Sequence, residues 1–425
     1  MNVKEHLDRE KASVKNKQVS EEAVDKREQY TEQLQLNQNI HKYILYAIFG
    51  QLLILGPVLT IFFLSKGLNF TQIFTIGAVN SLFVVLLEVP TGAVSDKYSR
   101  KLSIVIGCIL WIISLSIYIY AQNFITFVIG EIIFAMGMTF KSGSETAILY
   151  DSLKILGREA EFQSIIGKAR SYFLYASAVG SLVAGFVYSI NVYLPFIISI
   201  VFVVISFVIA LTFHEPKMHN FEVHNDKAYF DIIKNSASII FKNRKVLNVV
   251  LFSTITFIFM RMAYPFYQPH MKATGIDVKY FGVIFFLFNL VAGYSAKRVD
   301  KFMRFTKPYS MFSVGLLVAV SYLLLGMFPI FISFSFIFIQ QISRGLGNPV
   351  FSKHINKNIP SDYRATIISF NSLVGNIGVV ILQPLFGFLI DKFNVFSVEL
   401  GIGILMIACL SAIELFVKKG QIKNA

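Results

Sequence analysis

The most informative part of the chain is Glu88 to Lys101, with the sequence EVPTGAVSDKYSRK. The residues before it are apolar enough to end a membrane-spanning helix, yet this apolar run carries a glutamate. Glu88, Gly92 and Asp96 are spaced four residues apart, so they share one face of a helix. A carboxylate inside a span is costly and rarely without a function, and we therefore interpret the stretch as a gate at a helix end. A polar turn with a basic flank would explain Arg100 and Lys101 but not Glu88. The residues of this gate motif are Glu88, Pro90, Gly92, Asp96, Arg100 and Lys101.

Composition places the chain in a lipid bilayer. Of its 425 residues, 55% are hydrophobic and only 15% are charged, and long uncharged runs separate the polar segments. Both cysteines fall within apolar runs, so we expect neither disulfides nor a metal site. The first apolar run begins only near residue 42, which predicts that no cleavable signal peptide is present.

Twelve apolar runs of membrane length follow one another along the chain. We expect transmembrane helices near 42–65, 70–95, 101–121, 124–149, 166–190, 192–213, 246–269, 279–296, 308–328, 330–352, 362–390 and 396–417. The sequence therefore predicts an all-α membrane protein with twelve spans.

The basic residues are distributed unevenly between the two sides of this arrangement. The connections after odd-numbered runs carry four basic residues, Lys66, Lys272, Lys279 and Lys392. The even-numbered connections, the tails and the adjoining span ends carry thirty-one of the 39. Because basic residues concentrate on the cytoplasmic side, both termini are predicted to be cytoplasmic. The formal charge of +14 thus reflects topology and does not indicate nucleic-acid binding.

A polar connection divides the runs into two sets of six. The pattern of Gly92, Asp96 and Arg100 after the second run is echoed 201 residues later, after the eighth, at Gly293, Lys297 and Lys301. Two parallel halves with a site between them are a known design for transporters. The predicted organisation is a polar tail (1–41), a six-helix bundle (42–213), a cytoplasmic linker (214–245), a second six-helix bundle (246–417) and a short tail (418–425).

The chain resembles a major facilitator superfamily transporter over nearly all of residues 42–417. Gly92, Asp96, Arg100 and Lys101 are similar to the signature of that family between helices 2 and 3, with Ser99 in place of the usual glycine. The fuller pattern that begins at Glu88 also resembles clostridial-type tetracycline efflux proteins and related bacterial drug exporters. The helix 5 antiporter signature is poorly matched, because the glycines over 180–185 lack its proline. The resemblance implies two pseudo-symmetric bundles, and a latch between the Asp96–Arg100 cluster and helix 11.

Seven charged residues lie inside the apolar runs, away from their extreme ends. Each would cost about 2.5–3.5 kcal/mol at the centre of a bilayer, so they should face one another or water. They occur in runs 2, 4, 5, 7 and 10, which agrees with a central cavity lined by helices 1, 4, 7 and 10, as the resemblance implies. These residues are Glu88, Glu131, Lys141, Glu145, Arg170, Arg261 and Arg344.

Depth along the helices groups these charges. Glu131 and Arg261 lie at similar depth in runs 4 and 7, which allows either a shared ligand contact or a fixed ion pair. Arg344 has no obvious acidic partner in its half and is the best candidate for contacting an anionic ligand. Further polar candidates along the pathway are Gln51, Gln340 and Gln341. A local pairing network near the inner face is predicted for Lys141, Glu145, Asp151 and Arg170. His270, near a run end, is expected to be solvated.

Three classes of function compete. The first is a proton-coupled exporter of small amphipathic compounds or drugs in a bacterial cell membrane, in which Glu88 or Glu131 exchanges the proton. The second is an importer or exchanger of an anionic metabolite, favoured by Arg261, Arg344 and the missing proline. The third, a receptor or scaffold that does not transport, fits the intramembrane charges poorly. An enzyme is not expected, because the sequence has no nucleotide loop, nucleophile arrangement or metal cluster. We expect a monomer with a small-molecule substrate, no cofactor, no nucleic-acid partner and a proton gradient as the driving force.

Overall fold

The computed structural model describes residues 27–216, 240, 243–358 and 361–422, with no side-chain detail for 245, 358, 361–366, 368–369 and 417–422. Every regular element in these ranges is helical. The N-terminal half begins with a helix over residues 27–49. It continues with α2 (Leu59–Ser65), α3 (Phe70–Lys97), α4 (Arg100–Tyr120), α5 (Phe124–Lys141), α6 (Ser144–Ile155), η1 (Glu159–Glu161), α7 (Phe162–Ile190) and α8 (Leu194–Leu211).

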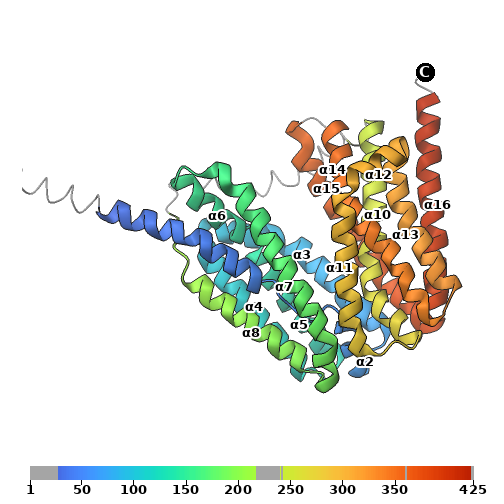
Figure 1. The fold of residues 1–425 in the computed structure, drawn as a ribbon, viewed down its shortest axis with the longest axis horizontal. Coiled ribbons are helices and arrows are strands. Elements are labelled where there is room, and N and C mark those ends of the chain that lie inside the picture. The colour runs from blue at the N-terminus through green and yellow to red at the C-terminus, as the bar shows by residue number, and fades with distance from the viewer. Residues whose placement is uncertain (1–26, 217–239, 241–242, 359–360, 423–425) are drawn as a thin grey trace, which may run out of the picture.

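The C-terminal half repeats this all-helical design. It consists of α10 (Arg244–Ala273), η2 (Val278–Tyr280), α11 (Phe281–Lys297), α12 (Val299–Thr306), η3 (Lys307–Tyr309), α13 (Ser310–Met327), η4 (Phe331–Phe336), α14 (Ile337–Asn358), α15 (Ser361–Lys392) and α16 (Val395–Ile422). The halves stand as two bundles that diverge toward one end of the molecule and meet at the other (Figure 1). We call the end that carries α6 and α12 the open end, and the end that carries η2 and α2 the closed end.

Ten helical stretches of the described chain are long and apolar enough to cross a membrane. The two predicted runs without such a stretch are the first and the tenth. In the first run, turns over residues 50–58 separate the leading helix from α2, where Gly56 and Pro57 interrupt the sequence. In the tenth run, Gln340, Gln341 and Arg344 reduce the apolar character of α14. The number of twelve spans stays a prediction.

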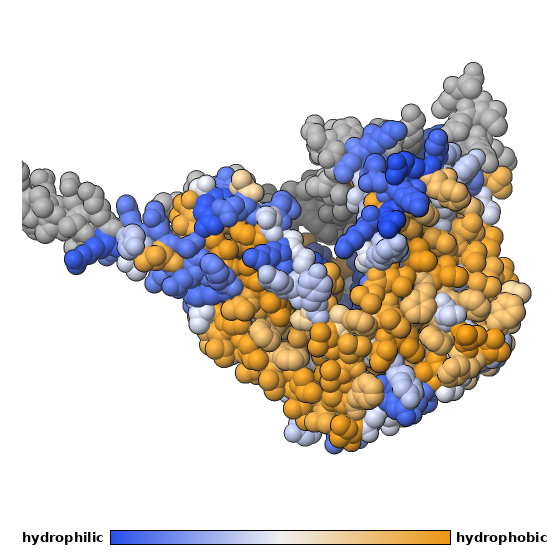
Figure 2. All heavy atoms as spheres, in the orientation of Figure 1, coloured by the Kyte–Doolittle hydropathy of each residue, from blue (hydrophilic) through white to orange (hydrophobic). Residues whose placement is uncertain are grey.

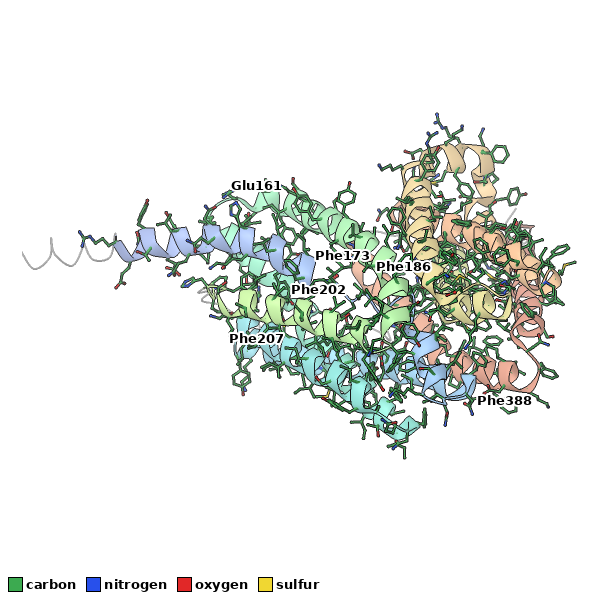
Figure 3. The ribbon with its side chains drawn as sticks, turned by 60° about the horizontal axis from the view of Figure 1, so that its bottom comes forward. Glu161, Phe173, Phe186, Phe202, Phe207 and Phe388 are labelled. Atoms are coloured by element: carbon green, nitrogen blue, oxygen red, sulfur yellow. The ribbon has the colours of Figure 1, made fainter. Side chains whose placement is uncertain are left out.

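The outer surface fits the lipid environment that the composition predicts. Hydrophobic residues cover the sides of both halves, and hydrophilic residues gather at the open end, where the surface between the halves is hollowed (Figure 2). Phe186 of α7 and Phe388 of α15 are about half exposed, and Phe388 lies at the outer edge of the molecule (Figure 3). Because such side chains would be unfavourable in water, their exposure is consistent with contact to acyl chains.

Several helix starts follow from capping residues in the sequence. The Asn69 side chain accepts a hydrogen bond from Gln72 N, and the Gln72 side chain accepts one from Asn69 N, which forms a capping box for α3. The Ser99 side chain caps α4 by accepting a hydrogen bond from Leu102 N, and the Asn123 side chain caps α5 by accepting one from Thr126 N. Pro90 lies inside α3, which continues to Lys97.

Within the predicted N-terminal tail (1–41), residues 27–41 are helical and pack on the first bundle, and the domain boundary stays a prediction. Leu36 and Ile40, one turn apart, are buried on one face. Asn39 donates hydrogen bonds to Ser152 Oγ at 3.0 Å and to the His214 carbonyl at 2.8 Å. Residues 1–26 and nearly all of the predicted linker lie outside the described residues.

Candidate functional site

A cavity of about 750 Å³ lies between the two halves. It extends from Thr60 and Gln268, near the closed end, to Ser352 and Ile355, toward the open end. Apolar walls from both halves alternate with polar groups. The polar lining residues include Asn80, Ser81, Glu131, Arg261, Tyr264, Arg344, Asn348, Asn371 and Gln383. A cavity of this size with a few convergent polar groups is typical of a small-molecule site.

Glu131, Arg261 and Arg344 all line this cavity, from α5, α10 and α14. The hydroxyl of Tyr118 on α4 donates a hydrogen bond to the Glu131 carboxyl. The predicted depth along the helices thus brings these residues to one void, while their roles in transport stay predictions.

Arg261 forms contacts across the two halves but does not pair with a carboxylate. Its guanidinium donates to Asn376 Oδ1 of α15 at 3.2 Å and to Ser81 Oγ of α3 at 3.4 Å. The structure shows no ion pair between Arg261 and Glu131. Of the two options in the sequence, the fixed ion pair is therefore absent from this conformation.

Arg344 is exposed to the cavity and has a neutral partner. It donates to Asn289 Oδ1 of α11 at 2.6 Å. Its positive charge is therefore not balanced by any described carboxylate within hydrogen-bonding distance. The two arginines together give the C-terminal wall of the cavity a positive charge.

The three candidate glutamines have different environments. Gln51 does not line the central cavity, and its Nε2 donates to Glu145 Oε1 at 3.0 Å. Gln341 is buried, donates to the Tyr267 hydroxyl at 3.0 Å and borders a smaller cavity described below. Gln340 is also buried but borders neither cavity.

The predicted network of Lys141, Glu145, Asp151 and Arg170 stays a prediction, because none of the ion pairs among the described side chains directly joins two of these four residues. Lys141 donates to the Gly50 carbonyl and lies 3.6 Å from the centre of the Trp111 ring, so its charge is held by a backbone dipole and a π face. Asp151 pairs with Arg100, and Arg170 is exposed beside Phe173. Depth alone could not give these partners, because they depend on the rotation of each helix about its axis.

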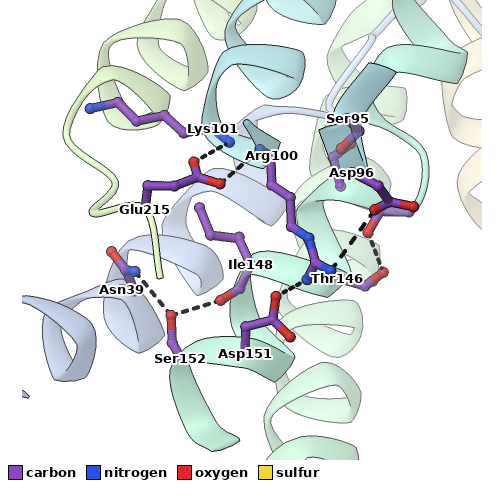
Figure 4. A network of polar contacts seen from close by, with 12 residues as sticks. Asn39, Ser95, Asp96, Arg100, Lys101, Thr146, Ile148, Asp151, Ser152 and Glu215 are labelled. Carbon is purple, nitrogen blue, oxygen red and sulfur yellow. Dashed lines mark hydrogen bonds and ion pairs between the residues drawn. The ribbon is translucent and has the colours of Figure 1, made fainter. Parts of the chain in front are cut away.

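The gate motif forms a cluster within the N-terminal half (Figure 4). Arg100 lies between Asp151 of α6, which it contacts closely, and Asp96 of α3 at 3.9 Å. Glu215 accepts from Arg100 N and Lys101 N, both at 2.8 Å, and so caps the start of α4. The latch to helix 11 that the resemblance implied is not formed by any described side chain, and the first residues of α15 lie outside that description.

The other members of the motif differ from expectation. Glu88 and Pro90 are exposed on α3 and do not border the central cavity. A Cβ atom at Gly92 would meet nothing within 4 Å, so this glycine does not bring α3 close to a neighbour in this conformation.

Sequence reasoning missed the contacts that join the halves at the closed end. Asp391 of α15 accepts from Phe70 N at 2.9 Å, Thr71 N at 2.8 Å and Thr71 Oγ1 at 2.6 Å, and therefore caps the α3 helix of the other half. Gln268 of α10 is buried, accepts from Ile61 N at 3.1 Å and donates to the Gly56 carbonyl at 2.7 Å. Asp391 lies at a helix end, where the sequence alone predicts an ordinary solvent-exposed charge.

A buried acid–imidazole cluster was also missed, and the expectation that His270 is solvated is wrong. Its Nδ1 lies 2.8 Å from Glu399 Oε2, its Nε2 lies 2.7 Å from Ser333 Oγ, and all three residues are buried. Position near the end of a run suggested solvent, but η4 and α16 cover this face of α10. Neither cavity reaches the cluster.

Comparisons with known proteins agree with this architecture. The family model described as Major Facilitator Superfamily matches residues 44–381. The chain is 27% identical over 360 residues to YxaM of Bacillus subtilis (strain 168), described as an uncharacterized MFS-type transporter, covering 80% of this chain and 86% of that protein. The chain therefore belongs to the major facilitator superfamily of membrane transporters.

Solved structures share the fold at low sequence identity. The nucleoside transporter NupG aligns with a TM-score of 0.71 at 15% identity, covering 90% of this chain and 99% of that one. A bacterial homolog of the human lysosomal transporter Spinster, in an inward-facing and unoccupied conformation, aligns with a TM-score of 0.63 at 16% identity, covering 92% and 95%. At these identities the likeness establishes the fold alone.

Proposed function

We propose that this protein is a secondary transporter that moves a small solute with an anionic group through the central cavity by alternating access. The observation that carries the proposal is the pair Arg261 and Arg344, which line one cavity and have only neutral hydrogen-bond partners among the described residues. A guanidinium whose charge no carboxylate neutralises favours an anionic ligand. The anionic metabolite of the second functional class thus fits the geometry best.

The open end is proposed to face the cytoplasm. Lys97, Lys101 and Lys154 lie at that end, whereas Lys279 and Lys392 lie at the closed end, and the sequence as a whole concentrates basic residues on the open side. The inward-facing state of the Spinster homolog, which shares the fold, supports the same orientation.

A panel of solutes on the purified protein tests the proposal. Small organic anions, neutral analogues and cations are added at constant ionic strength, and the melting temperature is measured. At least one class of anion is expected to raise it, because binding only to the folded state stabilises that state. Arg261→Gln and Arg344→Gln should each remove this response, and Arg170→Gln, which changes an exposed arginine outside both cavities, should keep it. Stabilisation by cations alone would contradict the proposal.

Proton coupling is assigned to Glu131 in this proposal. Of the two carboxylates considered, Glu131 borders the cavity and Glu88 does not. Alternating access changes the wetting of a cavity carboxylate and hence its tendency to hold a proton. Glu131→Gln is expected to abolish gradient-driven transport while the protein remains in the membrane, and Glu161→Gln, on the surface, serves as the control. Transport at the wild-type rate by Glu131→Gln would remove the assignment.

Export of amphipathic compounds remains the second candidate, because Phe63, Phe134, Phe257 and Met260 give the same cavity extensive apolar walls. Whole-cell accumulation of a cationic dye, measured with and without a proton uncoupler, separates the two. An exporter of amphipathic cations would keep the dye low until the uncoupler is added. A transporter of anionic solutes would leave dye accumulation equal to that of cells without the protein.

A further inference from the structure

A second, smaller cavity of about 150 Å³ lies beside the central one. Three residues, Tyr264, Tyr267 and Arg344, line both cavities, so the two cavities adjoin at these side chains. The helices around the small cavity come from both halves, with Ser177 and Ser181 on α7 facing Asn289 on α11 and Gln341 on α14. We refer to it as the side cavity.

The side cavity is lined by hydrogen-bonding groups that have capacity to spare. Gln341 has no exposed surface, and its Oε1 has no hydrogen-bond partner while its Nε2 donates to Tyr267. Which end of this amide points to Tyr267 depends on its flip, so the free end can act as donor or acceptor. An unpaired buried amide is unfavourable, which indicates a group that a ligand would satisfy.

Charge selects the kind of ligand. The residues around the side cavity include the guanidinium of Arg344 and several hydroxyl and amide groups, and they include no carboxylate. Arg344 donates through one nitrogen to Asn289, so its remaining N–H groups can serve an oxyanion in the forked geometry that guanidinium favours. The volume suits a compact group, because about 150 Å³ holds a molecule of the size of benzene.

We propose that the side cavity binds the compact oxyanion of the transported solute, a carboxylate or a phosphate, with Gln341 as a residue that determines specificity. The inference rests on the proposed function, in which the solute is anionic, and adds where its charged end lies. The rest of the solute occupies the central cavity on the other side of Tyr264 and Arg344. Since Ser181 and Asn289 belong to different halves, an oxyanion held here contacts both halves and changes its surroundings when they move.

The test uses the purified full-length protein and four probes: sodium acetate, sodium phosphate, glycerol 3-phosphate and uncharged glycerol. Binding is followed by thermal shift at constant ionic strength. The variants are Gln341→Leu, which removes the free amide, and Gln340→Leu, a matched change of the neighbouring buried glutamine that borders neither cavity. Gln341→Glu is the second variant, because it keeps the shape and places a like charge where the anion would lie.

At least one anion is expected to stabilise the wild-type protein and Gln340→Leu. Gln341→Leu should weaken its apparent affinity about tenfold or more, as expected for a hydrogen bond to a charged group, and Gln341→Glu should abolish the response. Stabilisation by acetate or phosphate alone would show that the free anion is sufficient, and stabilisation by glycerol 3-phosphate alone that the oxyanion must be part of a larger solute.

Two results would overturn the proposal. If no compact anion stabilises the wild-type protein, the side cavity does not bind one, while the wider panel of organic anions still decides the proposed function. If an anion stabilises Gln341→Leu and the wild type equally, and Arg261→Gln removes the effect, the anion binds in the central cavity only. The proposed function would then stand without the side-cavity site.

Discussion

The two ends of the molecule use similar polar chemistry for different purposes. At the closed end, Asp391 caps the N-terminus of α3 and Gln268 bonds to the backbone around α2, so each contact joins one half to the other. At the open end, Glu215 caps α4 and Arg100 pairs with Asp151, and both contacts stay within the N-terminal half. Contacts of the first kind hold this conformation, whereas contacts of the second kind keep one half rigid while it moves.

Of changes at the two ends, those at the closed end are therefore expected to shift the balance between the conformation seen here and one that opens the closed end more strongly than those at the open end. A reporter cysteine at Thr60, which is buried on the cavity wall near the closed end, measures this shift. The native cysteines, Cys108 and Cys409, are first replaced by serine. Labelling by a membrane-impermeant thiol reagent added outside intact cells then reports how often the closed end opens.

Gly282→Ala is expected to have the largest effect. The new Cβ would lie 2.1 Å from the Ser181 carbonyl oxygen of α7, a distance that forces α11 and α7 apart. Overpacking of this kind costs about 1–3 kcal/mol, which corresponds to an increase in outside labelling of roughly fivefold to 150-fold. Gly293→Ala on the same helix, where the Cβ meets nothing within 4 Å, should leave labelling unchanged. Equal labelling of both variants would mean that α7 and α11 do not hold the closed end.

Gln268→Leu is expected to come second. It leaves Ile61 N and the Gly56 carbonyl without their partners, and the net loss of these two hydrogen bonds costs about 1–2 kcal/mol in total. Opening lets water reach these groups, so the open state gains population and labelling rises about tenfold. Gln340→Leu controls for the loss of a buried amide elsewhere. An unchanged rate in Gln268→Leu would reduce this residue to a packing role.

Asp391→Asn is expected to have a smaller effect. Asparagine still caps a helix but lacks the negative charge that interacts with the N-terminus of α3, a difference of about 0.3–1 kcal/mol. Labelling should rise about twofold to fivefold, and added salt should reduce the gap between variant and wild type because the site is exposed. Asp277→Asn is the control, since Asp277 accepts from Lys279 N within its own half. A difference in labelling between Asp391→Asn and the wild type that does not depend on salt would contradict the electrostatic cause.

The contrast between contacts within one half and contacts between the halves also explains how much of the fold and the site the sequence alone can predict. Runs of apolar residues and the breaks at Gly56, Pro57 and the charged connections predict most helices, because length and hydropathy are local properties. Depth along each run also brings Glu131 and Arg261 to one cavity. The hydrogen-bond and ion-pair partners of a side chain cannot be predicted in this way, since they depend on the rotation of each helix and on the conformational state. The pairing of Arg100 with Asp151 and the burial of His270 against Glu399 are therefore visible only in the structure.

Asp96→Asn at the open end sharpens the comparison, because its effect on outside labelling is expected to be the smallest. Asp96 lies 3.9 Å from Arg100, is half exposed and forms its ion pair among the described residues within the N-terminal half, so removing its charge leaves the hydrogen bonds of Asp391 and Gln268 intact. Exposed pairs of this kind contribute about 0.2–1 kcal/mol, and within one half that energy is nearly equal in both conformations. Labelling should change less than twofold, as in Asp300→Asn, which removes an exposed pair within the C-terminal half.

The transport rate of Asp96→Asn is the second measurement. If Asp96 forms a latch to α15 when the open end closes, Asp96→Asn slows transport while Asp300→Asn does not, because only the first change weakens a state other than the one observed here. A rise in outside labelling for Asp96→Asn as large as that for Asp391→Asn would show that the two ends are not separable, and the division between contacts that join the halves and contacts that stiffen one half would be wrong.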